Sequence, residues 1–194
     1  MMDAMPLDFH QELMCWSAQL KSCKTSLTTA TKRMMQLPQG GTAIGTGVNS
    51  HRGFAKAFCQ TIEKVSGFKV KPAPNFFQGL SSQDNSAELS SAVKNLALVV
   101  MKISNDLRLM NSGPLTGLSD IELQALQPGS SIMPGKVNPV IPEAVSMACA
   151  DVIGNDVSIS VAVQSGNFHL NVMLPLIAYN LLKSINLMGN AMPL

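Results

Sequence analysis

Residues 84–110 read DNSAELSSAVKNLALVVMKISNDLRLM, and this stretch decides the fold. Apolar side chains recur along it at alternating spacings of four and three residues, which is typical of one face of an α-helix. A helix of this length reaches about 40 Å, at about 1.5 Å per residue. One small globule cannot cover such a stripe, so the stretch predicts a bundle of long helices. The stripe consists of Leu89, Val93, Leu96, Val100, Ile103 and Leu107, and the small residues Ser86, Ser90, Ala97 and Ser104 beside it would let a neighbouring helix approach closely.

Further segments carry the same helical pattern. One long helix is expected over residues 7–36, ending at Leu37-Pro38 because a proline ring cannot continue the hydrogen-bond ladder. Its stripe is Phe9, Leu13, Trp16, Leu20, Cys23, Leu27, Ala30 and Met34. A shorter helix is expected over residues 50–65, with Asn49 or Ser50 as its cap and Gly67 as its end, and two long helices over residues 141–163 and from residue 170 onward. The fold class predicted is all-α, with at most a short extended piece near residues 68–70.

The amino-acid composition indicates what covers the surface of this bundle. Charged residues make up 13% of the chain, about half of the usual share of roughly 25%, and the mean hydropathy is positive. Either the chain crosses a membrane or it buries much of its surface against other chains. No run of about 20 uninterrupted apolar residues occurs, so we expect burial against partner chains and no membrane span.

Charge and cysteine content point away from several other classes. The net charge is +2 with no block of Lys or Arg, so no nucleic acid partner is expected. The four cysteines show neither CxxC spacing nor a cluster with histidine, which favours reduced thiols in a cytoplasmic protein and predicts no metal. No signal peptide is visible at the start of the chain.

Residues 129–139, GSSIMPGKVNP, carry the most information about function. They lie in a connection, residues 115–139, that is rich in Gly, Ser and Pro, and a loop this long is usually functional or disordered. Two hydroxyls, an ammonium and an amide lie just before a predicted helix N-terminus, where free N–H groups favour anions. From the residues alone, a small-carboxylate site and an ordinary solvated loop both remain open. Glu143 alone would be a favourable charge at a helix start.

The same stretch resembles the signature of the fumarase/aspartase superfamily, in the fumarase form with Gly135 where aspartases usually have alanine. Similar motifs occur at residues 3–7, 41–47, 112–114, 154–156 and 166–171, so the resemblance covers nearly the whole chain. It implies that residues 1–194 are part of the central helical-bundle domain of that fold, including a signature loop at about residues 115–140. The N-terminal domain and the small C-terminal domain are expected to be absent from this chain.

The resemblance also implies a mechanism, a stepwise anti elimination that yields fumarate. Ser130 would be the base that removes a proton beside a carboxylate, and Glu143 would pair with a histidine near the leaving group. Ser131, Lys136 and Asn138 would bind the dicarboxylate, fumarate or malate. The family uses no cofactor in this step and is tetrameric, with sites built from three subunits, so a homo-oligomer, a tetramer, is expected.

The sequence also departs from the family pattern. The threonine–histidine pair that completes the site in relatives would precede the segment matching Met2-Asp3-Ala4, and none of the three histidines of the chain matches it. Leu115 stands where relatives usually have arginine after Ser-Gly-Pro, and the family's subunits are more than twice as long.

We therefore expect a fragment of a fumarate hydratase, a carbon–oxygen lyase, that is inactive alone. Two alternatives stay open: an aspartate ammonia-lyase, favoured by residues 140–143 and 170–173, and a non-catalytic helical assembly module.

Overall fold

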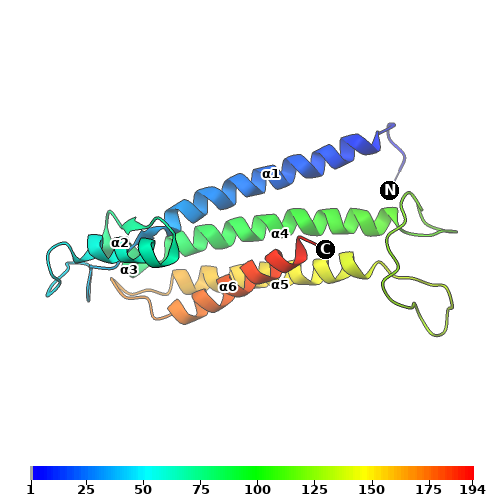
Figure 1. Cartoon of the computed structure of the whole chain (residues 1–194). Helices are drawn as coiled ribbons and strands as arrows, with labels where there is room; N and C mark the ends of the chain where they lie inside the picture. Colours follow the sequence, from blue (N-terminus) through cyan, green and yellow to red (C-terminus); the bar gives the residue numbers. More distant parts are fainter. Residues whose placement is uncertain (1) are drawn as a thin grey trace.

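A computed structural model describes residues 2–194 and shows long helices lying side by side (Figure 1). A small cap of short helices and two short strands lies at one end of this bundle, and an irregular connection, residues 111–139, lies at the other. The all-α prediction is confirmed. The long helices are α1 (Phe9–Met34), α4 (Asp84–Met110), α5 (Val140–Val163) and α6 (Leu174–Ala191); the cap contains α2 (Phe54–Ser66), α3 (Phe76–Ser81), β1 (Gln36–Leu37) and β2 (Lys71–Pro72), whose strands pair in parallel.

Helix α4 is the centre of the bundle, because it contacts α1, α5 and α6. The small residues predicted to allow close approach are all buried, and Ala97 is 0% exposed. Close contact with α5 follows from these short side chains. The main core cluster consists of Val93, Ala97 and Val100 from α4, Val145, Cys149 and Val152 from α5, and Met188 and Ala191 from α6.

A buried polar cluster also joins the long helices. The Asp156 carboxylate, 4% exposed, accepts hydrogen bonds from the Ser90 hydroxyl at 2.7 Å and from the Lys94 ammonium at 2.5 Å. The neighbouring Asn155 donates its amide to Ser184 on α6 at 3.2 Å. Residues 154–156 therefore link α5 to both of its neighbours through polar contacts as well as apolar packing.

Several helix ends agree with local sequence signals. The α1 helix begins with a capping box, in which Asp8 accepts from the His10 N–H at 2.9 Å and Gln11 accepts from the Asp8 N–H at 3.0 Å. Helix α2 ends at Gly67, whose φ of 75° favours glycine, as predicted. Pro175 lies in the first turn of α6, where its missing N–H costs nothing.

Two predicted helix starts are wrong. Helix α2 starts at Phe54 after the left-handed Gly53, not after Asn49 or Ser50. Helix α6 starts at Leu174, four residues later than predicted, because residues 167–170 form a bridge in which the Asn167 N–H donates to the Leu170 carbonyl at 2.9 Å. The six-residue α3 was not predicted, and the extended piece lies at residues 71–72 rather than 68–70.

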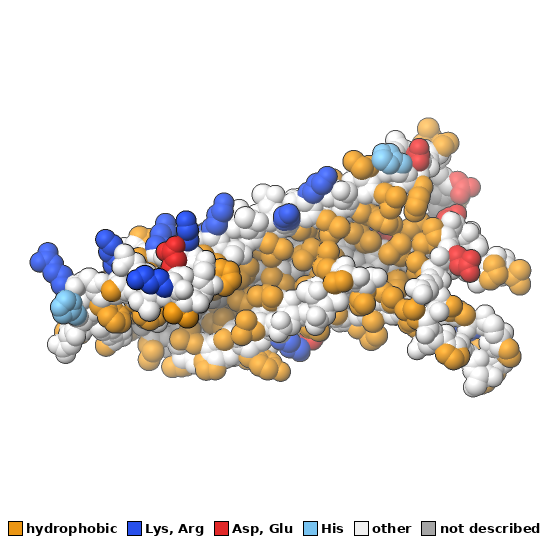
Figure 2. Space-filling model, in the orientation of Figure 1, with side chains coloured by type: hydrophobic (Ala, Val, Ile, Leu, Met, Phe, Trp, Pro, Cys, Tyr) orange, Lys and Arg blue, Asp and Glu red, His pale blue; other side chains and the backbone are white. Residues whose placement is uncertain are grey.

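The predicted stripe of α1 is only half covered. Trp16, Cys23 and Ala30 are buried, whereas Leu13 is 43% exposed and Phe9 is 50% exposed. Leu13, Leu20 and Leu27 of this stripe border a groove of about 900 Å³ that also includes Leu96 and Met192. Figure 2 shows apolar side chains gathered along the bundle beside α1. Large apolar side chains also point outward from α5 and α6, among them Met147, Val157, Val161, Tyr179 and Leu182.

Helix α5 is long and apolar enough to cross a membrane by length and composition alone. Core helices of globular proteins pass the same test. Here α5 packs against α4 and α6 and carries the ion-paired Asp156. We therefore interpret it as a core helix of the bundle.

Candidate functional site

The connection between α4 and α5 is anchored to the end of α4. The Asn111 side chain accepts a hydrogen bond from the Leu123 N–H at 2.8 Å, and the Met110 carbonyl accepts from the Asp120 N–H at 2.9 Å. The Ser112 carbonyl accepts from the Ser119 N–H at 2.8 Å, which closes the first turn of the loop. The loop therefore begins from a fixed base on a core helix.

Residues 129–136 close into a compact turn that needs two glycines. A Cβ atom added to Gly129 would lie 1.1 Å from the Lys136 carbonyl oxygen, so no other residue fits this close approach of two backbone segments. Gly135 has a φ of 84°, in the left-handed region that favours glycine. The Met133 N–H donates to the Ser130 carbonyl at 3.2 Å, and the Lys136 N–H donates to the Met133 carbonyl at 3.1 Å. These contacts close residues 129–136 into one unit, which contains the predicted base.

Ser130 lies half-buried in this turn, and Ser131 is exposed. The Ser130 Oγ accepts a hydrogen bond from the Ile132 N–H at 3.2 Å. A backbone N–H directed at this oxygen would stabilise a negative charge on it more than a neutral hydroxyl. The contact is thus one of those that the serine-base hypothesis requires.

Three of the five predicted site residues line one cavity of about 490 Å³. Lys136 and Asn138 come from the end of the signature loop, and Glu143 comes from the first turn of α5, where its N–H donates to the Pro139 carbonyl at 3.2 Å. The opposite wall is the end of α4. That wall consists of Asn105, Arg108, Leu109, Asn111, Ser112 and Gly113. Ser130 and Ser131 do not line the cavity, so the structure leaves the predicted base on a neighbouring turn.

The histidines lie elsewhere in the part of the chain that the structure describes. His10 is exposed near the start of α1. His51 precedes α2, and His169 lies between α5 and α6, where its ring contacts Phe77 edge-on with centroids 5.0 Å apart. No histidine among residues 2–194 lines the cavity beside Glu143, and none of their His, Cys, Asp and Glu side chains form a group of three that could bind a metal ion.

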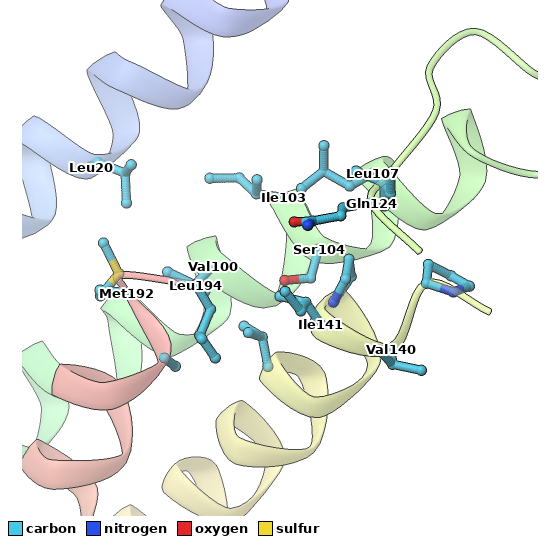
Figure 3. A pocket seen from close by; sticks show the side chains of 15 residues that line it. Leu20, Val100, Ile103, Ser104, Leu107, Gln124, Val140, Ile141, Met192 and Leu194 are labelled. Atoms are coloured by element: carbon cyan, nitrogen blue, oxygen red, sulfur yellow. The ribbon is translucent and has the colours of Figure 1, made fainter. Parts of the chain in front are cut away.

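A second cavity, of about 340 Å³, lies between α1, α4, α5 and the end of α6. Figure 3 shows Leu20 of α1 across from Met192, with Ile103 and Leu107 on α4, and Ser104 and Gln124 among the apolar side chains. No charged side chain among the described residues lines it. A carboxylate would find no cation there, so the candidate site is the cavity that contains Lys136.

Sequence reasoning missed the α4 wall of this cavity. Asn105 and Arg108 are three residues apart and therefore lie on one face of the helix, next to the Ser112-Gly113-Pro114 motif. Their spacing was available in the sequence, but only the fold brings that face against Lys136 and Glu143.

Comparisons with known proteins identify the family of the chain. A family model described as lyase matches residues 1–154. The chain is 56% identical over 194 residues to the fumarate hydratase class II of Xylella fastidiosa, covering 100% of this chain and 41% of that protein. It is 54% identical to fumarate hydratase class II 2 of Pseudomonas aeruginosa, covering 98% of this chain and 42% of that protein.

Solved structures resemble the whole bundle. The class II fumarase of Schistosoma mansoni superposes with a TM-score of 0.95 at 37% identity, covering 97% of this chain and 43% of that one. The fumarate lyase:delta crystallin of Brucella melitensis, in a crystal structure bound to cobalt, gives a TM-score of 0.94 at 41% identity, covering 98% of this chain and 42% of that one. The chain thus spans less than half of the length of these relatives.

Proposed function

Because this chain belongs to the fumarase/aspartase superfamily of lyases, we propose that the protein carrying it is a fumarate hydratase, which adds water reversibly to fumarate to give malate. The observation that carries the proposal is the cavity where Lys136, Asn138 and Glu143 meet, next to the turn that contains Ser130. Since the chain spans 41% of the length of its curated relative, the activity belongs to the whole protein.

The proposed chemistry follows from these four side chains. In the dehydration direction, the Ser130 alkoxide takes a proton from the carbon beside a carboxylate of malate, and the C–H electron pair passes into that carboxylate. The Lys136 ammonium and the Asn138 amide stabilise the resulting dianion more than the ground state, which lowers the barrier. The C–O bond then breaks, and an acid paired with Glu143 protonates the leaving hydroxide. Hydration follows the same steps in reverse.

Turn movement is part of this proposal. Ser130 is excluded from the cavity lining, whereas Lys136, at the other end of the same turn, is included. A small rotation of residues 130–135 about Gly129 and Gly135 would bring the Ser130 oxygen toward a bound carboxylate and exclude water from it. The exposed Ser131 would then become a further substrate contact.

Assembly is the second part of the proposal. We infer a cytoplasmic homo-oligomer, a tetramer, in which residues 1–194 form part of the central helical domain. Outward-facing apolar side chains on α5 and α6 support it, as does the lack of a histidine beside Glu143 within residues 2–194. For the same reason we expect this chain by itself to be inactive and to self-associate.

Two alternative functions, an aspartate ammonia-lyase and a non-catalytic assembly module, have less support. The two curated relatives described above are fumarate hydratases, which favours this activity over that of an aspartate ammonia-lyase. A non-catalytic assembly module fits the chain in isolation, but it gives no role to the GSSIMPGKVNP stretch.

The proposal is tested by Ser130→Ala in the full-length protein, with fumarate consumption followed by its ultraviolet absorbance. Loss of a general base should lower kcat by about 10²–10⁴-fold. Ser26→Ala, on the exposed side of α1, is the matched control and should retain full activity. An unchanged kcat for Ser130→Ala would refute the assigned mechanism, and turnover of aspartate without malate would refute the choice of substrate.

A further inference from the structure

The stretch that leads into the turn of Ser130 is held to the bundle at one polar point. Residues 122–129 form a single hydrogen bond with the rest of residues 2–194, from the Leu123 N–H to the Asn111 side-chain oxygen at 2.8 Å. Asn111 is itself fixed, because it ends α4 and its own N–H donates to the Leu107 carbonyl at 3.0 Å. A core helix therefore holds this part of the loop through one side chain.

Apolar packing holds the loop at the same place. Within residues 113–128, only Ile121 and Leu123 are not exposed. Leu123 lines the apolar cavity between α4 and α5, together with Leu107 of α4. Asn111 thus holds the backbone of one of the two residues through which this stretch packs against the helices.

The length of chain between this contact and the turn makes the contact matter for Ser130. From Leu123 to Gly129 the chain advances six residues, which span about 21 Å at full extension. If the contact were lost, the next hydrogen bond back along the loop would be the one from the Ile121 N–H to the Met110 carbonyl, at 3.4 Å. The free stretch would gain two residues, or about 7 Å of reach. Because a misplacement of about 1 Å can cost about 10²-fold in rate, this slack is large.

We propose that Asn111 is a positioning residue for the reaction. By holding Leu123 against the end of α4, its side-chain oxygen places the turn of residues 129–136, and the movement of that turn about Gly129 starts from a fixed point. The inference rests on the proposed function, because it takes Ser130 of this turn as the base. Asparagine suits the role because its short side chain offers a carbonyl oxygen as acceptor close to the helix end.

A direct contact between Asn111 and the substrate is the competing role, because Asn111 also lines the cavity. The two roles use different atoms. Its oxygen already accepts from Leu123, whereas its Nδ2 forms no hydrogen bond with the described residues and would be the donor to a substrate. The two roles also affect different steps. Lys136 and Asn138 lie on the α5 side of the turn, so loosening the other side should slow the step that needs Ser130 more than it weakens binding.

The experiment compares the full-length protein with Asn111→Leu, Asn111→Asp and the control Asn75→Leu. The control removes the same kind of contact at the opposite end of the bundle, where the Asn75 side-chain oxygen accepts from the Gln78 N–H at 3.2 Å. Two quantities are measured: kcat and KM for fumarate, and amide hydrogen exchange by mass spectrometry of peptides that cover residues 118–129.

Asn111→Leu should speed exchange at Leu123 and lower kcat, each by about 3- to 10-fold, which is the change in population that one hydrogen bond contributes. Its KM should change less than about twofold. Asn111→Asp keeps the accepting oxygen, so exchange and kcat should stay within about twofold of the wild type, while KM should rise because the added charge repels an anionic substrate. Asn75→Leu should match the wild type in kcat and in exchange of the loop.

The outcomes separate this inference from the proposed function. An unchanged kcat or unchanged exchange in Asn111→Leu would overturn the inference alone. Equal losses of kcat in Asn111→Leu and Asn111→Asp would also overturn it, because they would assign the effect to Nδ2 and a direct contact. A wild-type protein that does not hydrate fumarate would overturn the function; faster exchange in Asn111→Leu would then still support the placement of the loop by Asn111, and unchanged exchange would overturn it. If Asn111→Leu does not fold, Asn111→Ala decides by the same two measurements.

Discussion

Replacing Asp156 with asparagine should destabilise the bundle without changing the site. Asp156 is 4% exposed and accepts from Lys94 at 2.5 Å and from Ser90 at 2.7 Å. Asparagine retains an oxygen for the Ser90 hydroxyl but removes the charge that pairs with Lys94. Breaking a fully buried ion pair costs about 3–5 kcal/mol. Since the Lys94 side chain is 33% exposed, water can solvate part of its charge, so we expect a loss of about 2 kcal/mol.

Urea unfolding followed by far-ultraviolet circular dichroism measures this loss. Asp156→Asn should lower the midpoint with an unchanged m-value, which identifies a change in stability rather than in compactness. Lys94→Met is the partner variant. In the double variant neither charge remains, so the two losses should fall short of adding by about 1–2 kcal/mol. A loss below about 0.5 kcal/mol, or simple additivity, would show that the pair contributes nothing as a pair.

The same variant tests whether scaffold and site are separable. Asp156 follows the start of α5 by 16 residues, or about 24 Å along the helix. The cavity at the α5 start should therefore keep its geometry, and KM for fumarate should stay at the wild-type value. A large change in KM would mean that the shift of α5 against α4 reaches the loop.

Two further predictions concern the loop and the cap. Gly129→Ala should lower kcat/KM for fumarate by about 10²-fold with little change in the urea midpoint, because its Cβ would lie 1.1 Å from the Lys136 carbonyl oxygen and would open an exposed turn. The control is Gly189→Ala, because a Cβ at that position meets nothing within 4 Å. Equal activities of the two variants would contradict the role of Gly129. Burial opposes ionisation of Asp84, but hydrogen bonds from Ser82 and Gln78 and the charge of Arg33 outweigh it and lower the pKa of this carboxyl. Its stabilising contribution should therefore be complete above the unfolded pKa of about 3.9 and disappear as the pH falls through the lower folded pKa, so urea midpoints of wild type and Asp84→Asn should differ at about pH 7 and converge at about pH 2. A difference that persists in acid would contradict this assignment.

The sequence predicted the long helices well where local signals agreed. Helix α4 spans the same residues, 84–110, as the stretch that its apolar stripe indicated, and the sequence Ser112-Gly113-Pro114, which disfavours a helix, follows it directly. Helix α6 was misjudged at its start, because Asn171 is 1% exposed and donates its side-chain amide to the Ala162 carbonyl at 3.0 Å. That contact caps α5 through a residue nine positions after Ala162, and hydrophobic periodicity carries no such signal.

The residues of the candidate site also differ in how well the sequence predicts them. Lys136, Asn138 and Glu143 could be named together as candidate residues because they lie close together in the sequence, and all three line one cavity. Arg108 lines the same cavity but was not named, because it comes from α4 and meets the motif only once a loop of 29 residues, 111–139, folds back. Site residues that are close together in a sequence can be recognised as a motif. Residues that a distant helix contributes to the cavity can be recognised only when the packing of the helices is known.

In the proposed mechanism, the position of Ser130 sets an order of binding and chemistry. Lys136 already lines the cavity, whereas Ser130 lies outside it on a turn closed by Gly129. A carboxylate can therefore bind at Lys136 before the base arrives. If the base lined the cavity from the outset, its alkoxide would compete with the substrate for this cation. Keeping Ser130 apart until the carboxylate is bound avoids that competition, which gives the separation seen in the structure a chemical reason.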